Sequence, residues 1–319
     1  MWLMLVLALG ATGCRDDRFF VETAPERQAP AADAQRLVAL AERGAPATEQ
    51  RAALRRYLSA RRISAPTIAT VLRHTRDGIA LRPGASGDGA RLGGQPVLPA
   101  GEPWPRSAKG KPFTLIAVFD FSRLPHLEPL PQQGTLALYW NLNWFEEPGD
   151  GEMDFVAATR AYYVPPGGAT DHPSAPAESY PFGPISLDGT VTPIAGDPNL
   201  VAEEIKGRRD ANALYKAMDD VMTAGLYPHH LLGAPIEVQG PVLAGMPAYF
   251  DPKFKYLAPE SRERFTAAER ESGDWMLLAQ ISEDEGLTIA DGGELYFVIL
   301  RSDLAARRFD RVVGIMDSH

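Results

Sequence analysis

The chain has 319 residues, which is room for one large domain or two ordinary domains. Its content of 45% hydrophobic and 23% charged residues is typical of a soluble globular protein. The net charge of -9 argues against a nucleic-acid-binding surface, because phosphate groups require a basic face.

The N-terminal residues Trp2–Gly13 form an uncharged apolar run. A membrane-spanning helix needs about 20 such residues, so this run has instead the length of a signal-peptide apolar core. Cys14 follows directly, and Ala11-Thr12-Gly13-Cys14 resembles the lipobox of bacterial lipoproteins, in which the cysteine is acylated after cleavage before it. We therefore predict a signal peptide over residues 1–13 and fatty acyl groups, such as palmitate, on Cys14. The alternative is an ordinary signal peptide followed by an unmodified cysteine.

Cys14 is also the only cysteine of the chain, so the folded part has no disulfide and no thiol nucleophile. Two or three acyl chains would anchor the protein stably, because each buried CH₂ contributes about 0.8 kcal/mol. Residues 14–32 are polar and rich in Pro and Ala, which indicates a lipidated tether. Arg15 stands where lipoproteins retained at an inner membrane carry Asp, which favours the periplasmic face of the outer membrane.

Residues 33–78 have the apolar periodicity of helices, and we expect this segment to form two or three short helices. Gly44-Ala45-Pro46 separates the first two, and Ser64-Ala65-Pro66 gives the third a cap followed by a proline. Arginines crowd the middle of this segment. We interpret them as the solvated face of a helix, with a local basic patch as the alternative. They are Arg51, Arg55, Arg56, Arg61 and Arg62.

Residues 79–319 are predicted to form a β-rich body that also contains a helix between Leu200 and Leu226. A loop rich in Gly and Pro, Arg91–Pro105, is expected to be ordered because its apolar residues can pack on a core. A long surface excursion is expected over 165–184. The expected strands are a stretch beginning at Ile79, Phe113–Phe121, Gly134–Asn141, Phe155–Val164, Trp275–Ile281, Glu294–Leu300 and Arg311–Met316.

Two segments of this body resemble each other. Residues 114–141 and 275–301 each contain an apolar strand, an acidic turn and a second strand that begins with Gly-x-Leu and carries aromatic residues. This echo suggests duplication. We therefore predict an α+β fold with two pseudo-repeated antiparallel sheets, flanking helices and an N-terminal helical segment.

Four motifs between residues 79 and 319 together resemble the YwqG-like family, a bacterial domain of unknown function. This resemblance implies a β-rich α+β fold and brings no established activity. Two positions depart from the family pattern: Val118-Phe119 precede Asp120 where a Gln is usual, and no Trp stands before Asp291. The motifs are Leu92–Pro99 with Glu102–Pro105; Phe113–Phe121 with Leu130–Leu136; His230–Pro235 with Gln239; and Trp275–Ser282 with Gly293–Phe297, Asp303-Leu304 and Phe309.

No motif of a known reaction is present. We find no zinc spacing, no Gly-x-Ser-x-Gly elbow and no phosphate-binding Gly-rich loop, and we predict no metal and no cofactor. Catalysis would require carboxylates from both halves, such as Asp120 with Glu283 or Asp284, to meet in one cleft. An envelope hydrolase of this kind is the alternative function.

The preferred prediction is non-catalytic binding at the cell envelope, with an envelope protein, a peptide or a glycan as the ligand and no nucleic acid. Gln280 is an amide inside an apolar strand. It therefore either braces the loop that contains Gly93-Gly94, called the Gly-Gly loop, or lines a cleft between the halves. Trp144 lies beyond a strand end among polar residues, where an exposed role is plausible. The candidate binding-cleft residues are Trp104, Asp120, Trp144, Gln280, Glu283, Asp284 and Asp291.

Overall fold

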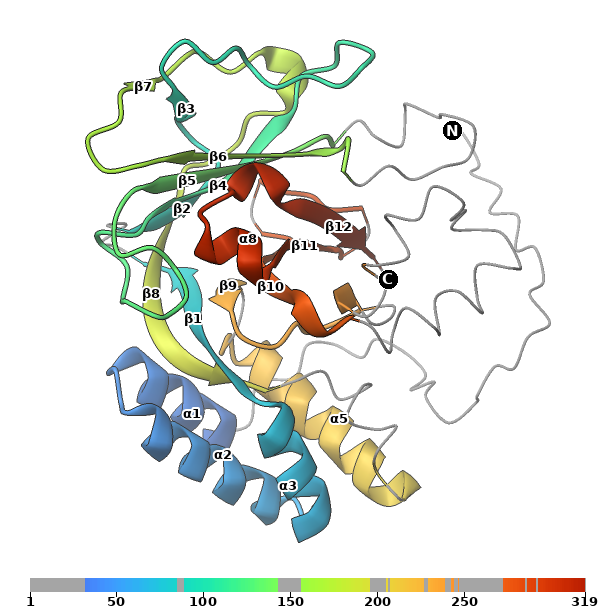
Figure 1. The fold of residues 1–319 in the computed structure, drawn as a ribbon. Helices are drawn as coiled ribbons and strands as arrows, with labels where there is room; N and C mark the ends of the chain where they lie inside the picture. The colour runs from blue at the N-terminus through green and yellow to red at the C-terminus, as the bar shows by residue number, and fades with distance from the viewer. Residues whose placement is uncertain are drawn as a thin grey trace, which may run out of the picture.

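The computed structural model describes residues 32–84, 89–142, 156–195, 205, 207–226, 229–238, 242–243, 246, 272–284, 286–290 and 292–318. Figure 1 shows a curled β-sheet with a group of helices at its lower end. Within the described ranges, no helix combines the length and the apolar composition that crossing a bilayer requires.

Three helices occupy the N-terminal segment: α1 (Ala32–Glu42), α2 (Ala47–Ala60) and α3 (Ala65–His74). Helix α5 (Arg208–Thr223) lies beside them (Figure 1). Their buried faces share one apolar cluster with Ile194 and Ala195, which lie at the end of strand β8. Helical periodicity therefore predicted these elements correctly, because each helix has one apolar face to bury.

Arg61 joins three of these helices. Its guanidinium donates to Asp33 at 2.6 and 3.1 Å and to Asp220 of α5 at 3.0 Å, and it lies 3.6 Å from the centre of the Tyr57 ring. The Tyr57 hydroxyl in turn donates to the Ala217 carbonyl of α5 at 2.7 Å. The helices are therefore joined to each other by directional contacts as well as by apolar packing.

The main sheet has ten antiparallel strands in the order β12-β11-β10-β9-β1-β8-β2-β4-β5-β6. Two-residue strands β3 (Leu98–Pro99) and β7 (Thr170–Asp171) form a second, small sheet. Other short elements among the described residues are α8 (Arg301–Ala305) and the 3₁₀ turns η2 (Ala177–Ser179), η3 (Ser272–Asp274) and η4 (Phe309–Arg311). The main strands are β1 (Arg76–Pro83), β2 (Ala90–Leu92), β4 (Thr114–Asp120), β5 (Thr135–Trp140), β6 (Thr159–Val164), β8 (Ile185–Ile194), β9 (His229–Leu232), β10 (Trp275–Ser282), β11 (Glu294–Leu300) and β12 (Val313–Asp317).

The sheet has an internal pseudo-twofold symmetry between β1 and β8. The first half contains β8, β2, β4, β5 and β6, and the second half contains β1, β9, β10, β11 and β12 in the equivalent places. Leu92 pairs with Ala117 as Leu231 pairs with Ala279. The β4–β5 and β10–β11 pairs also both shift register just before those alanines. The echo in the sequence therefore corresponds to equivalent strands with equivalent register.

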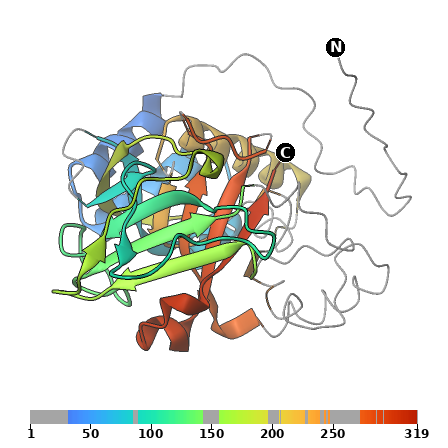
Figure 2. The ribbon, with the colours of Figure 1, turned by 90° about the horizontal axis from the view of Figure 1, so that it is seen from above.

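The two edges of the sheet approach each other, so the sheet is almost a closed barrel (Figure 2). The Gly314 N–H of β12 donates to Thr159 Oγ1 of β6 at 2.7 Å. A Cβ atom on Gly314 would lie 2.6 Å from the Trp140 ring, so only glycine permits this approach. One apolar core contains residues from both halves, among them Phe119, Leu136, Leu295 and Phe297.

The predicted α+β class with a β-rich body is confirmed. The structure differs from the expected pair of sheets, because the two halves are parts of one continuous sheet joined through β1 and β8. The predicted loop over 91–105 is ordered and contains β3. Strand β8 was not predicted, because its Gly189 and Pro193 interrupt an otherwise half-buried polar sequence.

Candidate functional site

A chain of buried polar side chains crosses the second half of the sheet. Gln280 of β10 is 3% exposed. Its Oε1 accepts from the Ile236 N–H at 2.9 Å, and its Nε2 donates to the Ile236 carbonyl at 2.9 Å. The Tyr296 hydroxyl donates to the same carbonyl at 2.9 Å. Gln280 therefore braces the segment after Pro235, which is the pseudo-twofold equivalent of the Gly-Gly loop that we expected it to brace.

Glu294, at the start of β11, is the acidic centre of this chain. Its Oε2 accepts from Gln280 Nε2 at 3.1 Å and from Ser282 Oγ at 3.0 Å, and no other partner is present among the described residues. Burial raises the pKa of the Glu294 carboxyl from its ordinary value of 4.5 to about 7, although both hydrogen bonds oppose this rise. The carboxyl therefore exchanges its proton near neutral pH.

Two further carboxyl groups lie close to this centre. Asp317 is the cross-strand neighbour of Glu294, and Glu237 is 7% exposed with its Oε1 accepting from the Val242 N–H at 2.7 Å. Burial and these three carboxylates raise the pKa of Tyr296 above its ordinary value. The Tyr296 hydroxyl therefore stays protonated and acts as a donor.

His229 extends this series of polar side chains to the opposite face of β9. Its Nδ1 accepts from the Ser282 N–H at 3.2 Å, so its Nε2 carries the proton and donates to Asp284 Oδ2 at 2.9 Å. The imidazole is 1% exposed. Ser282 thus connects His229 with Glu294, and we call the set Asp284, His229, Ser282, Glu294, Gln280 and Tyr296 the polar network.

His230 is a second buried polar side chain on the face of the sheet that carries Gln280. It is the cross-strand neighbour of Gln280 and is fully buried, and neither ring nitrogen has a hydrogen-bond partner within the described part of the chain. The Ala234 backbone lies near the ring but not in hydrogen-bonding geometry. Burial lowers the pKa of the imidazole to about 3, so the ring is neutral at physiological pH.

The first half of the sheet provides an internal comparison. The position of Gln280 is taken there by Val118, and that of Tyr296 by Ala137, as the strand registers show. Thr135 takes the place of Glu294. The first half therefore forms the same strand pairs without a glutamine, tyrosine or glutamate at these three positions, and Asp120 takes the place of Ser282. Because burying polar groups costs free energy, the polar network is a specific addition to the second half rather than a requirement of the fold.

The structure does not bring the predicted cross-half carboxylates together. Asp120 accepts from Ser122 N–H at 3.0 Å and Oγ–H at 2.6 Å, and Glu283 accepts from the Ile289 N–H at 3.0 Å. Each carboxylate thus stabilises its own turn. Strand β4, which ends at Asp120, is separated from β10 by four other strands, so its acidic turn lies on another part of the barrel than Glu283 and Asp284.

The predicted aromatic residues are mostly structural. Trp104 is half-buried, packs edge-on against Tyr139 at 5.7 Å between ring centres, and donates from Nε1 to the Phe113 carbonyl at 3.0 Å. Tyr139 and Trp140 are fully buried. Cys14, Trp144 and Asp291 lie outside the described residues.

A groove lies where the two halves meet across the seam of the barrel. It encloses about 520 Å³, a volume typical of ligand sites. One wall is the loop Glu128–Gln133 of the first half, with Pro166 beside it. The other wall is Leu304, Ala305 and Arg307 of the second half. We call this feature the seam groove.

The seam groove has a firm base and free polar groups. Below it, the Tyr163 ring packs on Phe309 at 4.8 Å, and the Tyr163 hydroxyl donates to the Gln133 carbonyl at 2.9 Å. The side chains of Gln132, Gln133 and Arg307 are exposed and have no hydrogen-bond or ion-pair partner among the residues described. The motifs Leu130–Leu136 and Asp303-Leu304 meet at this groove, and no pattern in the sequence predicts that they meet.

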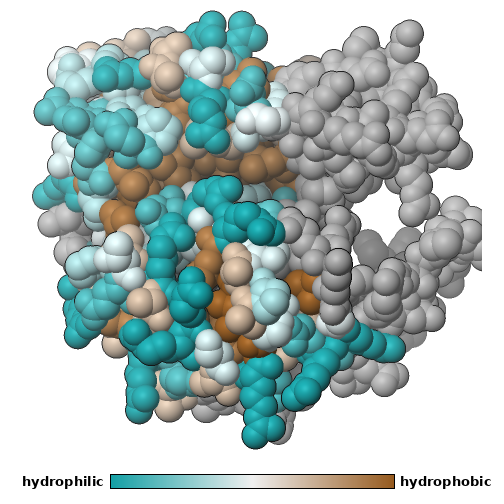
Figure 3. Space-filling model, turned by 60° about the horizontal axis from the view of Figure 1, so that its bottom comes forward, coloured by the Kyte–Doolittle hydropathy of each residue, from teal (hydrophilic) through white to brown (hydrophobic). Residues whose placement is uncertain are grey.

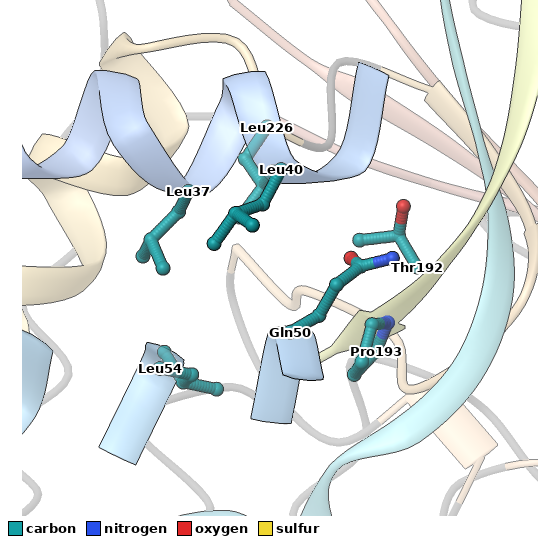
Figure 4. A pocket seen from close by; sticks show the side chains of 7 residues that line it. All are labelled: Leu37, Leu40, Gln50, Leu54, Thr192, Pro193 and Leu226. Carbon is teal, nitrogen blue, oxygen red and sulfur yellow. The ribbon is translucent and has the colours of Figure 1, made fainter. Parts of the chain in front are cut away.

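A second hollow lies between α1, α2 and β8 (Figure 4). Leu37, Leu40 and Leu54 line it together with Gln50, which donates to the Ala45 and Val191 carbonyls. Its free space is about 10 Å³, which is hardly enough for one water molecule. It is therefore a packing contact and not a ligand site.

Metal ligands do not cluster in the described ranges, where no group of three His, Cys, Asp or Glu side chains is placed to hold an ion. His229 and His230 are adjacent on a strand, so their side chains point to opposite faces of the sheet.

A family model for a domain of unknown function, DUF1963, matches residues 90–318. The chain belongs to the DUF1963 family. The DUF1963 region contains both the polar network and the seam groove, and it begins at β2. It leaves out α1, α2, α3 and the central strand β1. No curated protein matches the chain.

Proposed function

We propose that this DUF1963 protein is an exported lipoprotein, anchored through Cys14, that binds an envelope protein, peptide or glycan without transforming it. The finer assignment to a YwqG-like group is part of this proposal and is supported by the four sequence motifs. The outer membrane is the proposed site, on its periplasmic face.

The observation that carries the binding proposal is the seam groove. It is large enough for a ligand, and its floor is fixed by Tyr163 and Phe309. The exposed amides of Gln132 and Gln133 and the exposed guanidinium of Arg307, which have no partner among the described residues, provide donors and acceptors of the kind that peptide bonds and sugar hydroxyls need. Binding there requires no catalytic group, and the part of the groove lining that the structure describes contains no His and a single carboxylate, Glu128.

Anchoring is tested by metabolic labelling with a clickable fatty acid in cells that express the full chain. We expect label on the wild-type protein and none on the Cys14→Ala variant. Label that remains on Cys14→Ala would contradict the proposal.

Binding is tested by recovering the full-length protein from membranes and identifying what accompanies it by mass spectrometry. We expect a partner that is retained by the wild-type protein and lost when Gln133→Ala and Arg307→Gln are combined. The matched control is the exposed pair Lys111→Gln and Arg301→Gln, which should retain the partner.

One observation favours a second function, an envelope hydrolase. The pKa of Glu294, at about 7, suits general acid–base catalysis at neutral pH, and Ser282 Oγ is hydrogen-bonded to it. Turnover of peptidoglycan or an ester by the pure protein, abolished by Glu294→Gln, together with no recovered partner, would establish the hydrolase and overturn the binding proposal.

A further inference from the structure

The helical segment has a charge opposite to that of the whole chain. Residues 33–77 hold nine arginines against four acidic residues, a net charge of +5, whereas the chain as a whole carries -9. The rest of the chain therefore carries -14. This segregation places the excess positive charge next to the proposed lipid tether, residues 14–32.

Some of these arginines are used within the fold. Arg43 pairs with Glu49 at 2.5 Å, Arg51 pairs with Asp77 at 2.7 Å, and Arg61 binds Asp33 and Asp220. These contacts satisfy the cations concerned and leave little attraction for an external anion.

Three of the others, which lie on α2 or just after it, have no such contact within the described part of the chain. Arg55, Arg56 and Arg62 are exposed, and among the described residues none has an ion-pair or side-chain hydrogen-bond partner. Arg55 and Arg56 lie on α2 opposite its buried face, which contains Leu54 and Leu58. Their accessibility follows from the helical period, because the apolar face must turn toward the core.

Helix α5 extends this surface. Asp210 of α5 accepts from the Ser64 N–H at 3.1 Å and from Thr67 Oγ1 at 2.7 Å, so the start of α5 lies beside the start of α3, two residues after Arg62. Arg208 and Arg209 precede Asp210 and are exposed. We define Arg55, Arg56, Arg62, Arg208 and Arg209 as the basic surface. Figure 3 shows this end of the molecule, where hydrophilic side chains protrude between apolar ones.

We propose that the basic surface docks on a bilayer through anionic phospholipid headgroups. This inference rests on the proposed lipid anchor, which would keep the surface close to the membrane. The proposed tether has only 19 residues, so even fully extended it would reach no more than about 65 Å, and the helices remain near the headgroups. Arginine is suited to them because its planar guanidinium forms paired hydrogen bonds with phosphate oxygens.

The charge distribution favours a membrane over a nucleic acid as the partner. A nucleic acid would meet the negative remainder of the chain as it extends past the helices, whereas a bilayer presents its charge on one plane. Two or three acyl chains would already hold the protein at the membrane, so the basic surface would determine which face of the helical segment meets the headgroups.

The test is co-sedimentation of the mature chain, residues 14–319 carrying Cys14→Ala, with lipid vesicles, so that neither the apolar signal segment nor an acyl group contributes. Vesicles of phosphatidylcholine alone are compared with vesicles that contain one quarter phosphatidylglycerol, at low and high salt. We expect strong binding only to the anionic vesicles at low salt, because salt screens charge. Each arginine near an anionic surface strengthens binding by roughly fivefold, so Arg55→Gln, Arg56→Gln and Arg62→Gln together should weaken it about 100-fold.

A matched triple variant provides the control. Arg106→Gln, Lys111→Gln and Arg301→Gln remove the same charge from exposed positions on the β-rich body and should change binding by no more than about twofold. Equal binding to neutral and anionic vesicles, or equal loss in both triples, would overturn the proposal. So would binding to duplex DNA without binding to vesicles.

The docking and anchoring proposals fail separately. Binding to anionic vesicles by a protein that takes up no fatty acid in cells would refute the anchor and support docking. Fatty-acid labelling of a protein whose Cys14→Ala form ignores anionic vesicles would do the reverse.

Discussion

Replacing Glu294 by glutamine should change how the stability of the protein depends on pH. The Glu294→Gln side chain keeps the shape of the original and an oxygen that can accept from Gln280 and Ser282. It cannot ionise, however, so it removes the cost of placing a negative charge at this buried position.

The sign follows from the protons that each state binds. Between pH 4.5 and about 7 the folded protein keeps a proton on Glu294 that the unfolded chain releases, so stability falls as the pH rises. Each pH unit costs about 1.4 kcal/mol, and the whole interval costs about 3 kcal/mol. His230 acts in the opposite sense, because its pKa falls from 6.5 to about 3 on folding and stability therefore rises with pH between those values.

The assay is urea unfolding of the wild-type protein and Glu294→Gln at pH 5, 6.5 and 8. In the wild type, the slopes from Glu294 and His230 oppose each other between pH 4.5 and 6.5. We expect similar stabilities near pH 5, and a variant that is about 3 kcal/mol more stable than the wild type at pH 8. Glu178→Gln, at an exposed position, is the control. A difference that is the same at every pH would refute the argument.

Three further predictions concern the contacts that hold the fold, and each is measured as the free energy of unfolding in urea. Gly314→Ala should destabilise the protein by about 1–3 kcal/mol, because the added Cβ would meet the Trp140 ring. Gly273→Ala, with open space around it, should change stability by less than about 0.5 kcal/mol. Equal effects would count against the close approach of β12 to β6. Arg61→Met should lower the free energy of unfolding by about 2 kcal/mol, because it removes the hydrogen bonds to Asp33 and Asp220. Arg55→Met, in α2 itself, should lower it by less than about 0.5 kcal/mol. A reversed order would contradict the assigned contacts. Tyr296→Phe and Tyr139→Phe should each cost about 1 kcal/mol of stability, because each removes a hydrogen bond from a tyrosine hydroxyl. The acceptors are the Ile236 and Val97 carbonyls, which occupy equivalent places in the two halves. A loss of stability in only one variant would show that the two hydrogen bonds do not contribute equally.

The sequence predicts much of the sheet, because its central strands are long apolar runs. Strands β4, β5, β10 and β11 are buried on both faces, which gives them continuous hydrophobic sequences. Strand β8 escapes prediction because it lies half-exposed and its sequence contains Gly189 and Pro193. Its place in the sheet depends on pairing with β1 and β2, which no local pattern encodes.

The candidate site is only partly predictable. Gln280 stands out as an amide in an apolar strand, and the structure places it at the centre of the polar network. Glu294 does not stand out, since an acidic residue at the start of a strand usually belongs to a turn, and its burial depends on distant contacts with Gln280 and Ser282. The seam groove joins segments about 170 residues apart, so it depends on closure of the barrel.

Photo-crosslinking from the seam groove tests the binding proposal most directly. A benzophenone amino acid is introduced at position 132 of the full-length protein in living cells, or at position 180, where Tyr180 is 53% exposed outside the groove. We predict a light-dependent adduct from position 132 that disappears when Gln133→Ala and Arg307→Gln are added, and no such adduct from position 180. The same adducts from both positions, or an adduct that survives Gln133→Ala with Arg307→Gln, would contradict a binding site in the groove.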